Sequence, residues 1–383
     1  MQTVELIAPC HFGMESVLKR EISDLGYEIT CVEDGKVTFR GDLSAICRAN
    51  VFLRTTERVL LKVAQFQAET FEELFQGTKA VPWEAYLPEH AKFWVAKANS
   101  IKSKLFSPSD IQSIMKKAMV ERMKSVYHRN HFPEDGPSYA LRVTIIKDVV
   151  TIGIDTSGES LHKRGYRKVT SKAPVTETLA AAILLLSPWK KDRILIDPFC
   201  GSGTFPIEAA MIGANLAPGR NRSFISESWP MIPKELWSAA RSEADTKADP
   251  SVSLQIQGYD IDPQMVEAAR ENAKLAGVDH LIHLQQREVK DLHTQKKYGF
   301  VITNPPYGER LEEKEAMPAL YREMGTAFRQ MDTWSFFILT GYEEAEMYRA
   351  RKADKNRIIY NGMLKTYLYQ FMGPKPPKPK KED

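Results

Sequence analysis

Short apolar runs with a period of two alternate with amphipathic stretches over the first part of the chain. This pattern predicts helices at residues 14–24 and 43–52 and strands at 4–8, 30–33, 36–39 and 59–66. Strands that alternate with helices in this order are typical of a small α+β sheet.

A second group of elements follows, with predicted strands at residues 93–98, 139–147 and 149–155. A helix at 108–127 lies between the first two of these strands. Ser107 can cap this helix, Pro108 suits its first turn, and apolar residues then repeat at helical spacing. The group therefore predicts a second small α+β unit.

An apolar helix comes first, and from Arg193 the pattern becomes α/β, because helices then alternate with short and almost wholly apolar strands. The predicted strands lie at 194–196, 254–259, 281–285, 300–303, 336–340, 357–360 and 366–372, and the first helices at 177–186 and 205–213. Strands without polar alternation are typical of a parallel sheet that is buried on both faces.

The turn after the first of these strands reads DPFCGSGT and is rich in glycine. Glycines remove side chains where backbone must approach a ligand, and the following helix offers free N–H groups to a carboxylate. The turn therefore predicts a cradle for a nucleoside cofactor, with these contact residues: Asp197, Phe199, Gly201, Gly203 and Thr204.

Acidic residues follow the next two strands. Asp260, beside Ile261, ends the second strand, where a carboxylate accepts both hydroxyls of a ribose in nucleotide-binding sheets. Glu288 follows the third strand, and we expect it to accept from an adenine amino group.

The fourth strand leads into Asn304, Pro305, Pro306 and Tyr307. Two oxygen acceptors beside an aromatic ring can hold a planar group that carries an NH2, and a ring stacked on an extruded base is used by base-flipping enzymes. The motif therefore predicts catalysis at an amino nitrogen, with Asn304 also near the cofactor. Alternatively, Tyr307 is a structural turn residue.

The net charge is only +4, but residues 97–172 hold fifteen Lys and Arg against seven Asp and Glu. This surplus of eight positive charges predicts a phosphate-binding surface. The candidate RNA contacts are Lys102, Lys104, Lys116, Lys117, Lys163, Arg164 and Arg167, with Tyr166 stacking on a base. The alternatives are a solvated basic face and, for residues 161–172, a plain linker.

The four cysteines are widely spaced, and no export signal or run of about 18 apolar residues is present. These features predict a cytoplasmic protein without a metal site, a disulfide or a membrane span. The insert at 215–253, with Trp229 and Trp237, is interpreted as a decoration near the substrate mouth.

DPFCGSGT, GYDID and NPPYGER resemble the first, second and fourth motifs of class I S-adenosylmethionine-dependent methyltransferases. The segment before them resembles a THUMP RNA-binding domain. The order of FWVAKANS, TIGIDTSGESLHKRGYR, APVTETLAAAILL and DPFCGSGT is similar to the large-subunit ribosomal RNA guanine-N(2)-methyltransferase L family and its shorter Gram-positive relatives.

This resemblance implies a Rossmann-like, mostly parallel sheet of seven strands with an antiparallel last strand. It also implies a ferredoxin-like α+β domain (1–60), a THUMP domain (61–160) and the methyltransferase domain (161–373). The proline- and lysine-rich composition of residues 374–383 predicts a disordered tail. The implied cofactor is S-adenosylmethionine. The chain leaves no room for the second methyltransferase domain that some family members carry.

The implied reaction is methylation of a guanine exocyclic amino group, in ribosomal RNA or in an assembling large subunit. Three alternatives remain: a transfer-RNA guanine enzyme, an amino-methyltransferase for DNA adenine or protein glutamine, and a non-catalytic RNA-binding assembly factor. The intact glycine turn, Asp260 and the NPPY motif disfavour the last alternative. The sequence does not indicate an oligomeric state.

Overall fold

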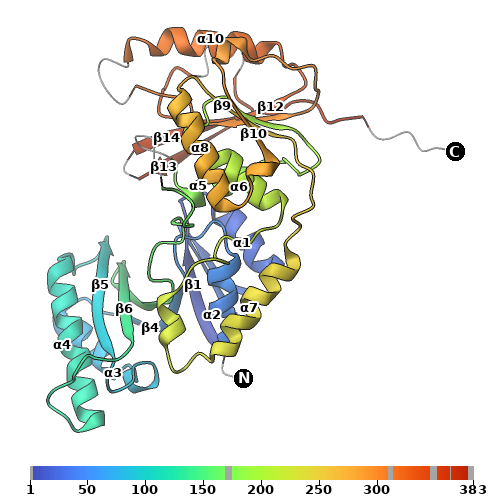
Figure 1. Ribbon diagram of the computed structural model, residues 1–383. Helices are drawn as coiled ribbons and strands as arrows, with labels where there is room; N and C mark the ends of the chain where they lie inside the picture. Colours follow the sequence, from blue (N-terminus) through green and yellow to red (C-terminus); the bar gives the residue numbers. More distant parts are fainter. Residues whose placement is uncertain (1–2, 169–174, 309–313, 346–351, 363, 378–383) are drawn as a thin grey trace. The chain divides into compact units, whose positions relative to one another are not determined.

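The computed structural model of the protein describes residues 3–168, 175–308, 314–345, 352–362 and 364–377 (Figure 1). The chain forms two compact units, which are described separately below. The N-terminal unit contains residues 1–10, 19–161 and 219–244, and the C-terminal unit contains residues 11–18, 162–218 and 245–383. Residues 378–383 of the predicted tail lie outside the described part of the chain.

The N-terminal unit is built on one sheet of seven strands, in the order β2-β3-β1-β4-β7-β6-β5. The strands are β1 (Val4–Pro9), β2 (Glu28–Glu33), β3 (Lys36–Gly41), β4 (Leu60–Gln67), β5 (Lys92–Ile101), β6 (Ser138–Ile146) and β7 (Val149–Asp155). The sequence suggested two small sheets, but β4 pairs antiparallel with β7 over the length of both strands. The two groups of elements therefore form one continuous sheet.

The helices α1 (Glu15–Asp24), α2 (Leu43–Phe52), α3 (Phe71–Ala80) and α4 (Pro108–Tyr127) accompany this sheet. α4 begins as predicted, with the Ser107 side chain accepting from the Asp110 backbone N–H and proline in the first turn. α3 was not predicted. It carries a complete capping box between Thr70 and Glu73.

Residues 219–244, which belong to the predicted insert, are part of the N-terminal unit. They include the first residues of α7 (Lys234–Lys247). The indole of Trp229 stacks on Tyr139 with ring centroids 4.6 Å apart, and its Nε1 donates to the Ser138 carbonyl at 3.0 Å. Trp237 stacks on Phe224 at 5.2 Å. Both tryptophans are buried, so the segment packs in the core of this unit rather than decorating a substrate mouth.

The C-terminal unit contains a second seven-stranded sheet, in the order β10-β9-β8-β11-β12-β14-β13. Its strands are β8 (Leu195–Asp197), β9 (Ile256–Asp260), β10 (Ile282–Gln286), β11 (Phe300–Thr303), β12 (Ser335–Thr340), β13 (Lys355–Asn361) and β14 (Leu364–Phe371). β8 to β12 pair in parallel, whereas β14 is antiparallel to both of its neighbours. This arrangement is the predicted methyltransferase sheet.

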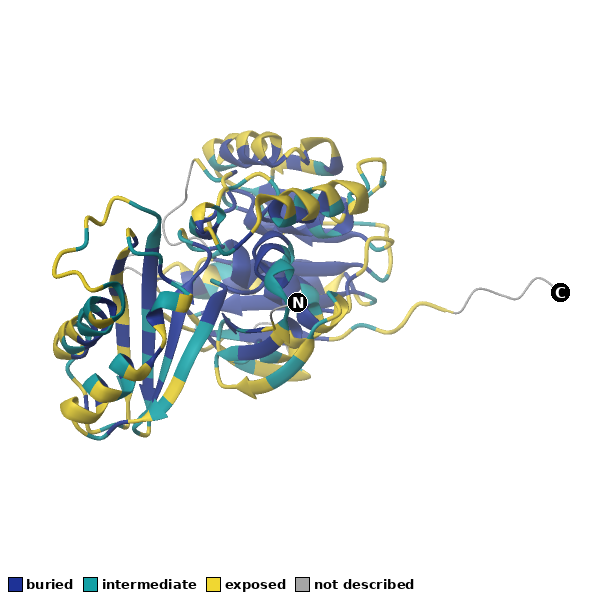
Figure 2. Ribbon diagram, turned by 90° about the horizontal axis from the view of Figure 1, so that it is seen from below, coloured by how far each residue is buried: buried dark blue, intermediate teal, exposed yellow. Residues whose placement is uncertain are grey.

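Its helices are α5 (Glu177–Leu186), α6 (Thr204–Gly213), α8 (Pro263–Ala276) and α10 (Met317–Arg329). Figure 2 shows that the strands are largely buried, while the outer surfaces of the helices are exposed. Every residue of β11 and β12 is buried, as their continuous apolar sequences predict. Within the described residues, no helix is long and apolar enough to cross a membrane.

Candidate active site

The carboxyl ends of β8, β9 and β11 bring three polar residues to one edge of the C-terminal sheet. Asp197 ends β8, Asp260 ends β9, and Asn304 follows β11. β8 pairs in parallel with both β9 and β11. The strand order reverses beside β8, and ligands of open α/β sheets bind at such a switch point.

The turn between β8 and α6 has the backbone shape of a ligand cradle. Gly201 and Gly203 have φ values of 50° and 90°, which side chains rarely adopt. A Cβ atom on Gly203 would lie only 3.0 Å from the Cβ of Ala269. Gly203 also caps α6 without a side-chain hydrogen bond, so the first N–H groups of the helix remain available to an anion.

Ser202 lies inside this turn. Its hydroxyl is buried and has no hydrogen-bond partner among the described residues. A buried polar group without a partner costs free energy unless a ligand or water satisfies it. Ser202 therefore adds a candidate cofactor contact that the sequence interpretation omitted, although it stands between the two predicted glycines.

The carboxylate of Asp260 is fixed by backbone donors. Gly201 N–H donates to Oδ2 at 2.9 Å, and Asp262 N–H donates to Oδ1 at 3.0 Å. An ionised carboxylate has about four acceptor positions, and those that the backbone leaves open can accept from the hydroxyls of a ribose. The neighbouring Ile261 is 63% exposed, which leaves an apolar surface where an adenine could pack.

Glu288, the third acidic candidate, forms an ion pair with Lys290 at 2.5 Å. Its side chain is 43% exposed. Its position after β10 is as predicted, while its contact with adenine remains a prediction.

Asn304 and Tyr307 occupy the segment that follows β11. The Asn304 side-chain oxygen is buried, and it accepts no hydrogen bond from any described residue. The ring of Tyr307 packs against the backbone of Gly341, where a Cβ atom would lie 2.9 Å from Cδ2 of the tyrosine. Gly341 was not recognised from the sequence, because its only signal is a glycine that follows an apolar strand.

Asp197 links the cofactor turn to β11. Its Oδ1 accepts from the Thr303 hydroxyl at 2.6 Å and from the Phe199 N–H at 3.1 Å. Burial raises the pKa of this carboxyl to about 7, with a further increase from the charge of Asp260; the two hydrogen bonds oppose the shift. Asp197 thus serves as an internal acceptor rather than as an exposed ligand.

This raised pKa predicts a specific pH dependence of stability. Folded Asp197 holds its proton more tightly than unfolded Asp197, so its contribution is largest below about pH 4 and declines as pH rises toward 7. The decline is at most about 1.4 kcal/mol per pH unit. Urea unfolding of the wild type and of Asp197→Asn should show that the wild type loses stability relative to the variant over this range. A difference that does not change with pH would contradict the assignment.

Two of the predicted RNA contacts are buried in the C-terminal unit. Arg164 pairs with Glu208 at 3.4 Å, and the Tyr166 hydroxyl donates to the same carboxylate at 3.1 Å. The side chains of Arg164 and Glu208 are 1% and 0% exposed. In this position Tyr166 cannot stack on a base, in contrast to the exposed patch indicated by the polar sequence around it.

Arg167 also points inward, to the start of α6. Its Nε lies 3.2 Å from Glu177, and its Nη2 donates to the Thr204 hydroxyl at 2.7 Å and to the Val175 carbonyl at 2.9 Å. Burial raises the pKa of Glu177. An arginine and a carboxylate therefore meet beside the helix N-terminus that the sequence assigns to the cofactor.

The remaining candidate cations differ in their surroundings. Lys104 pairs with Glu69, and Lys116 pairs with Glu134 at 3.0 Å while donating to the Phe93 carbonyl. Lys102, Lys117 and Lys163 are exposed. Of the predicted RNA residues, Lys104 and Lys116 are therefore already paired with acids, and the role of all five lysines in RNA binding stays a prediction.

A seven-stranded, mostly parallel sheet with a glycine turn, an acid after the second strand and NPPY after the fourth defines a class I methyltransferase. The family model described as "RMKL-like, methyltransferase domain" matches residues 164–370. Models of the RlmL ferredoxin-like domain and of the THUMP domain match residues 5–60 and 68–155. The chain belongs to the RMKL-like methyltransferase family, which confirms the predicted family and fold class.

Two curated relatives illustrate this membership. The "Putative RNA methyltransferase YpsC" of Bacillus subtilis is 48% identical, and the match covers 100% of both chains. The ribosomal RNA large subunit methyltransferase K/L of Cellvibrio japonicus is 33% identical over 96% of this chain. The chain spans only 51% of the length of that relative.

Three solved structures are similar over nearly the whole chain. A "possible methylase" from Clostridium difficile 630 is 50% identical, with a TM-score of 0.95 and coverage of 99% of this chain and 100% of the other. A "predicted N6-adenine-specific DNA methylase" from Listeria monocytogenes is 49% identical, with a TM-score of 0.92 and coverage of 98% and 97%. The structure described as "SMU.472, a putative methyltransferase complexed with SAH" is 46% identical, with a TM-score of 0.92 and coverage of 98% and 100%.

Proposed function

We propose that this protein methylates the exocyclic N2 amino group of a guanine in large-subunit ribosomal RNA. The observation that supports the proposal is the buried Asn304 oxygen, which lacks a hydrogen-bond donor among the described residues and which a substrate amino group would satisfy. The matched THUMP domain and the RNA methyltransferase names of the relatives support RNA as the substrate. We place this reaction in the cytoplasm.

S-adenosylmethionine is the cofactor, and it supplies a methyl group on a positively charged sulfur. Asp260 would hold the ribose hydroxyls, and Ile261 would pack on the adenine. The turn from Gly201 to Thr204 would enclose the methionine part of the cofactor. Arg167 and Glu177 meet beside Thr204 with opposite charges. They match the carboxylate and the ammonium group of the cofactor's amino-acid end.

A nucleobase amino group is a poor nucleophile because its lone pair is delocalised into the ring. If the Asn304 oxygen and the Pro305 carbonyl each accept one N–H, the nitrogen lone pair turns out of the ring plane toward the methyl group. Tyr307 would stack on the extruded base, with Pro306 and the Gly341 backbone fixing the plane of its ring. Orientation of the two reactants then supplies most of the acceleration.

Adenine N6 in DNA is the second candidate, because it is also an aromatic amino group and a similar solved structure is described as an adenine DNA methylase. We expect deletion of the gene to remove N2-methylguanosine from large-subunit ribosomal RNA and to leave N6-methyladenine in DNA unchanged. Mass profiles of nucleosides from separated ribosomal RNA, transfer RNA and DNA test this. Loss of the mark from transfer RNA, or of N6-methyladenine from DNA, would replace the proposed substrate.

A further inference from the structure

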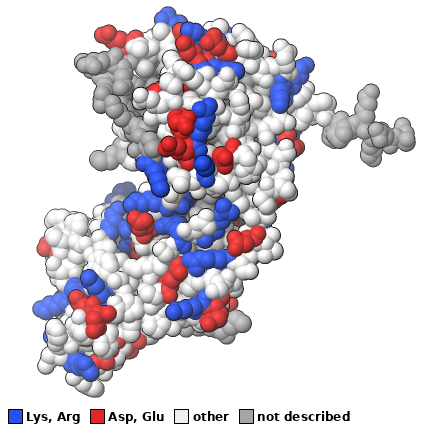
Figure 3. Space-filling view, viewed as in Figure 1, with Lys and Arg blue, Asp and Glu red and all other residues white. Residues whose placement is uncertain are grey.

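In the N-terminal unit, the strands β4 to β7 and the helices α3 and α4 differ in the signs of the charges that they carry. Strands β4 to β7 carry four cations, Lys62, Lys92, Lys97 and Arg142, and a single acid, Asp155, which is 1% exposed. By contrast, α3 and α4 carry both signs, and Figure 3 shows Lys and Arg interspersed with Asp and Glu at the end of the unit that holds these helices. Strands β4 to β7 therefore have a net charge of +3 (four cations, one acid), whereas α3 and α4 together have a net charge of +1 (five cations, four acids).

Strand register places these cations on the face opposite the helices. Phe66 meets α3 at Gly77, and Phe93 meets α4 at Lys116, so both aromatic rings lie on the helix side. Successive side chains on a strand alternate between faces. The bulge between Val95 and Lys97 adds one residue to β5, so that Lys97 lies on the face opposite Val95. Lys97 lies beside Arg142, Arg142 beside Gly153, and Gly153 beside Lys62. Three of the four cations, Lys97, Arg142 and Lys62, thus lie in one row across four strands, about 14 Å long. Lys62 in this row pairs with Glu5 at 2.8 Å.

The same face offers an aromatic ring and neutral hydrogen-bonding groups. Trp94 is 39% exposed on the edge strand β5 and shares this face with Lys92. The next row contains Asn99, Thr144, Thr151 and Gln65. Cations beside an exposed ring and neutral polar groups suit a single-stranded nucleic acid, because phosphates take the charges and any base can stack.

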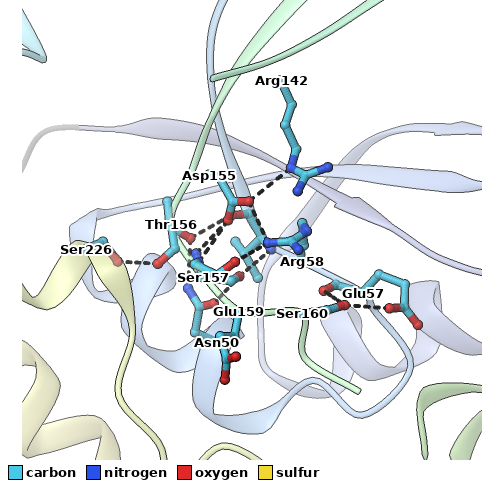
Figure 4. A network of polar contacts seen from close by, with 12 residues as sticks. Asn50, Glu57, Arg58, Arg142, Asp155, Thr156, Ser157, Glu159, Ser160 and Ser226 are labelled. Atoms are coloured by element: carbon cyan, nitrogen blue, oxygen red, sulfur yellow. Dashed lines mark hydrogen bonds and ion pairs between the residues drawn. The ribbon is translucent and has the colours of Figure 1, made fainter. Parts of the chain in front are cut away.

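Arg142 is held in place by the buried Asp155. The Nε of Arg142 donates to Asp155 Oδ2 at 3.0 Å, and Arg58 donates to the same oxygen at 2.7 Å. The other oxygen of Asp155 accepts from the N–H groups of Ser157 and Gly158, so the carboxylate is itself fixed (Figure 4). Two arginines on one carboxylate leave a net positive charge in a defined geometry, which is what phosphate recognition requires.

We infer that this helix-free face of strands β4 to β7, with Lys92, Trp94, Lys97 and Arg142, binds the backbone and one base of single-stranded RNA. The inference rests on the proposed RNA substrate and names the surface that holds it. It replaces the cations of the helices and of residues 163–167 as the main RNA contact. Lys92 and Lys97 are the best probes, because neither side chain forms an ion pair with any described residue.

The test uses the full chain and a labelled single-stranded RNA of about 16 nucleotides, titrated at several salt concentrations. The Lys92→Gln/Lys97→Gln double variant should flatten the log-log salt dependence by about 0.7 for each phosphate that the variant no longer neutralises. Trp94→Ala should weaken binding about 5- to 100-fold with an unchanged salt slope, because it removes stacking and no charge. The matched control, Lys117→Gln/Lys124→Gln on α4, removes two charges from the helix side and should leave both quantities unchanged.

Equal effects of the two lysine pairs would show unspecific attraction and overturn the inference. The inference would also be overturned if the Lys92→Gln/Lys97→Gln and Trp94→Ala variants bound RNA with the salt slope and affinity of the wild type. If the wild-type protein itself does not bind the RNA, the proposed substrate fails, and this outcome is distinct from failure of the surface. Thermal unfolding of each variant checks that the edge strand has not been disrupted.

Discussion

Replacement of Asn304 by alanine is expected to lower kcat by about 100- to 1000-fold, the range found when one oriented hydrogen-bonding group is removed from an active site. Affinity for S-adenosylhomocysteine should change little, because Asp260 and the turn at Gly201 to Gly203 do not depend on the Asn304 side chain. The stability of the fold should also persist, since the Asn304 oxygen accepts no hydrogen bond from the described residues.

Methylation of saturating RNA measures the turnover of the variant, and calorimetric titration of S-adenosylhomocysteine measures its affinity for the cofactor product. Asn304→Asp is the matched control, because it keeps an oxygen in the same place and should retain more activity than Asn304→Ala. If the alanine variant turns over within a few fold of the wild type, the segment after β11 is structural. The mechanism proposed for Asn304 and Pro305 would then be incorrect.

Local sequence predicted those features of the C-terminal unit that depend on local chemistry. The apolar strand before Asp197, the glycines at 201 and 203 and the acid after β9 all lie where the pattern placed them. A buried parallel strand must be apolar throughout, and its glycine turn must adopt positive φ values. Both constraints act within a few residues of sequence.

Long-range partners were not predictable from local pattern. Tyr166 and Arg164 lie in a polar, basic stretch, yet a buried Glu208 more than forty residues later pairs with both. Local pattern predicts a decoration for the segment of Trp229, because its stacking partner Tyr139 lies far earlier in the chain. A segment rich in charged residues is predicted to be exposed to solvent unless the buried residue of opposite charge that pairs with it is known.

The proposed RNA-binding face of β4 to β7 was likewise not predictable from local sequence. Summing charge over residues 97–172 detected a surplus of positive charge but could not say which side of a sheet carries it. The sum mixes the paired lysines of α4 with Lys97 and Arg142 on the strands. Strand register, which requires the pairing partners, separates the two sets.

The two ends of the cofactor site should respond differently to mutation, and this contrast is the sharpest test of the assignment of Arg167. Arg167→Met removes a charge beside the start of α6, so affinity for S-adenosylhomocysteine should fall by about 10- to 100-fold, as for removal of one charged hydrogen bond. Affinity for 5′-methylthioadenosine, which lacks the amino-acid end, should be unchanged. Asp260→Ala should weaken both ligands by similar factors, because both contain the ribose.

Calorimetric titration of the two ligands against the three proteins gives the comparison directly. Binding of 5′-methylthioadenosine also serves as a folding control for Arg167→Met, in which the buried Glu177 loses its partner. If Arg167→Met binds both ligands like the wild type, Arg167 holds only Glu177 and Thr204, and the amino-acid end of the cofactor lies elsewhere. If Asp260→Ala leaves both affinities unchanged, the carboxylate after β9 does not hold a ribose. The contrast between the ligands therefore assigns each charged residue to one end of the cofactor, because only the ribose is common to both.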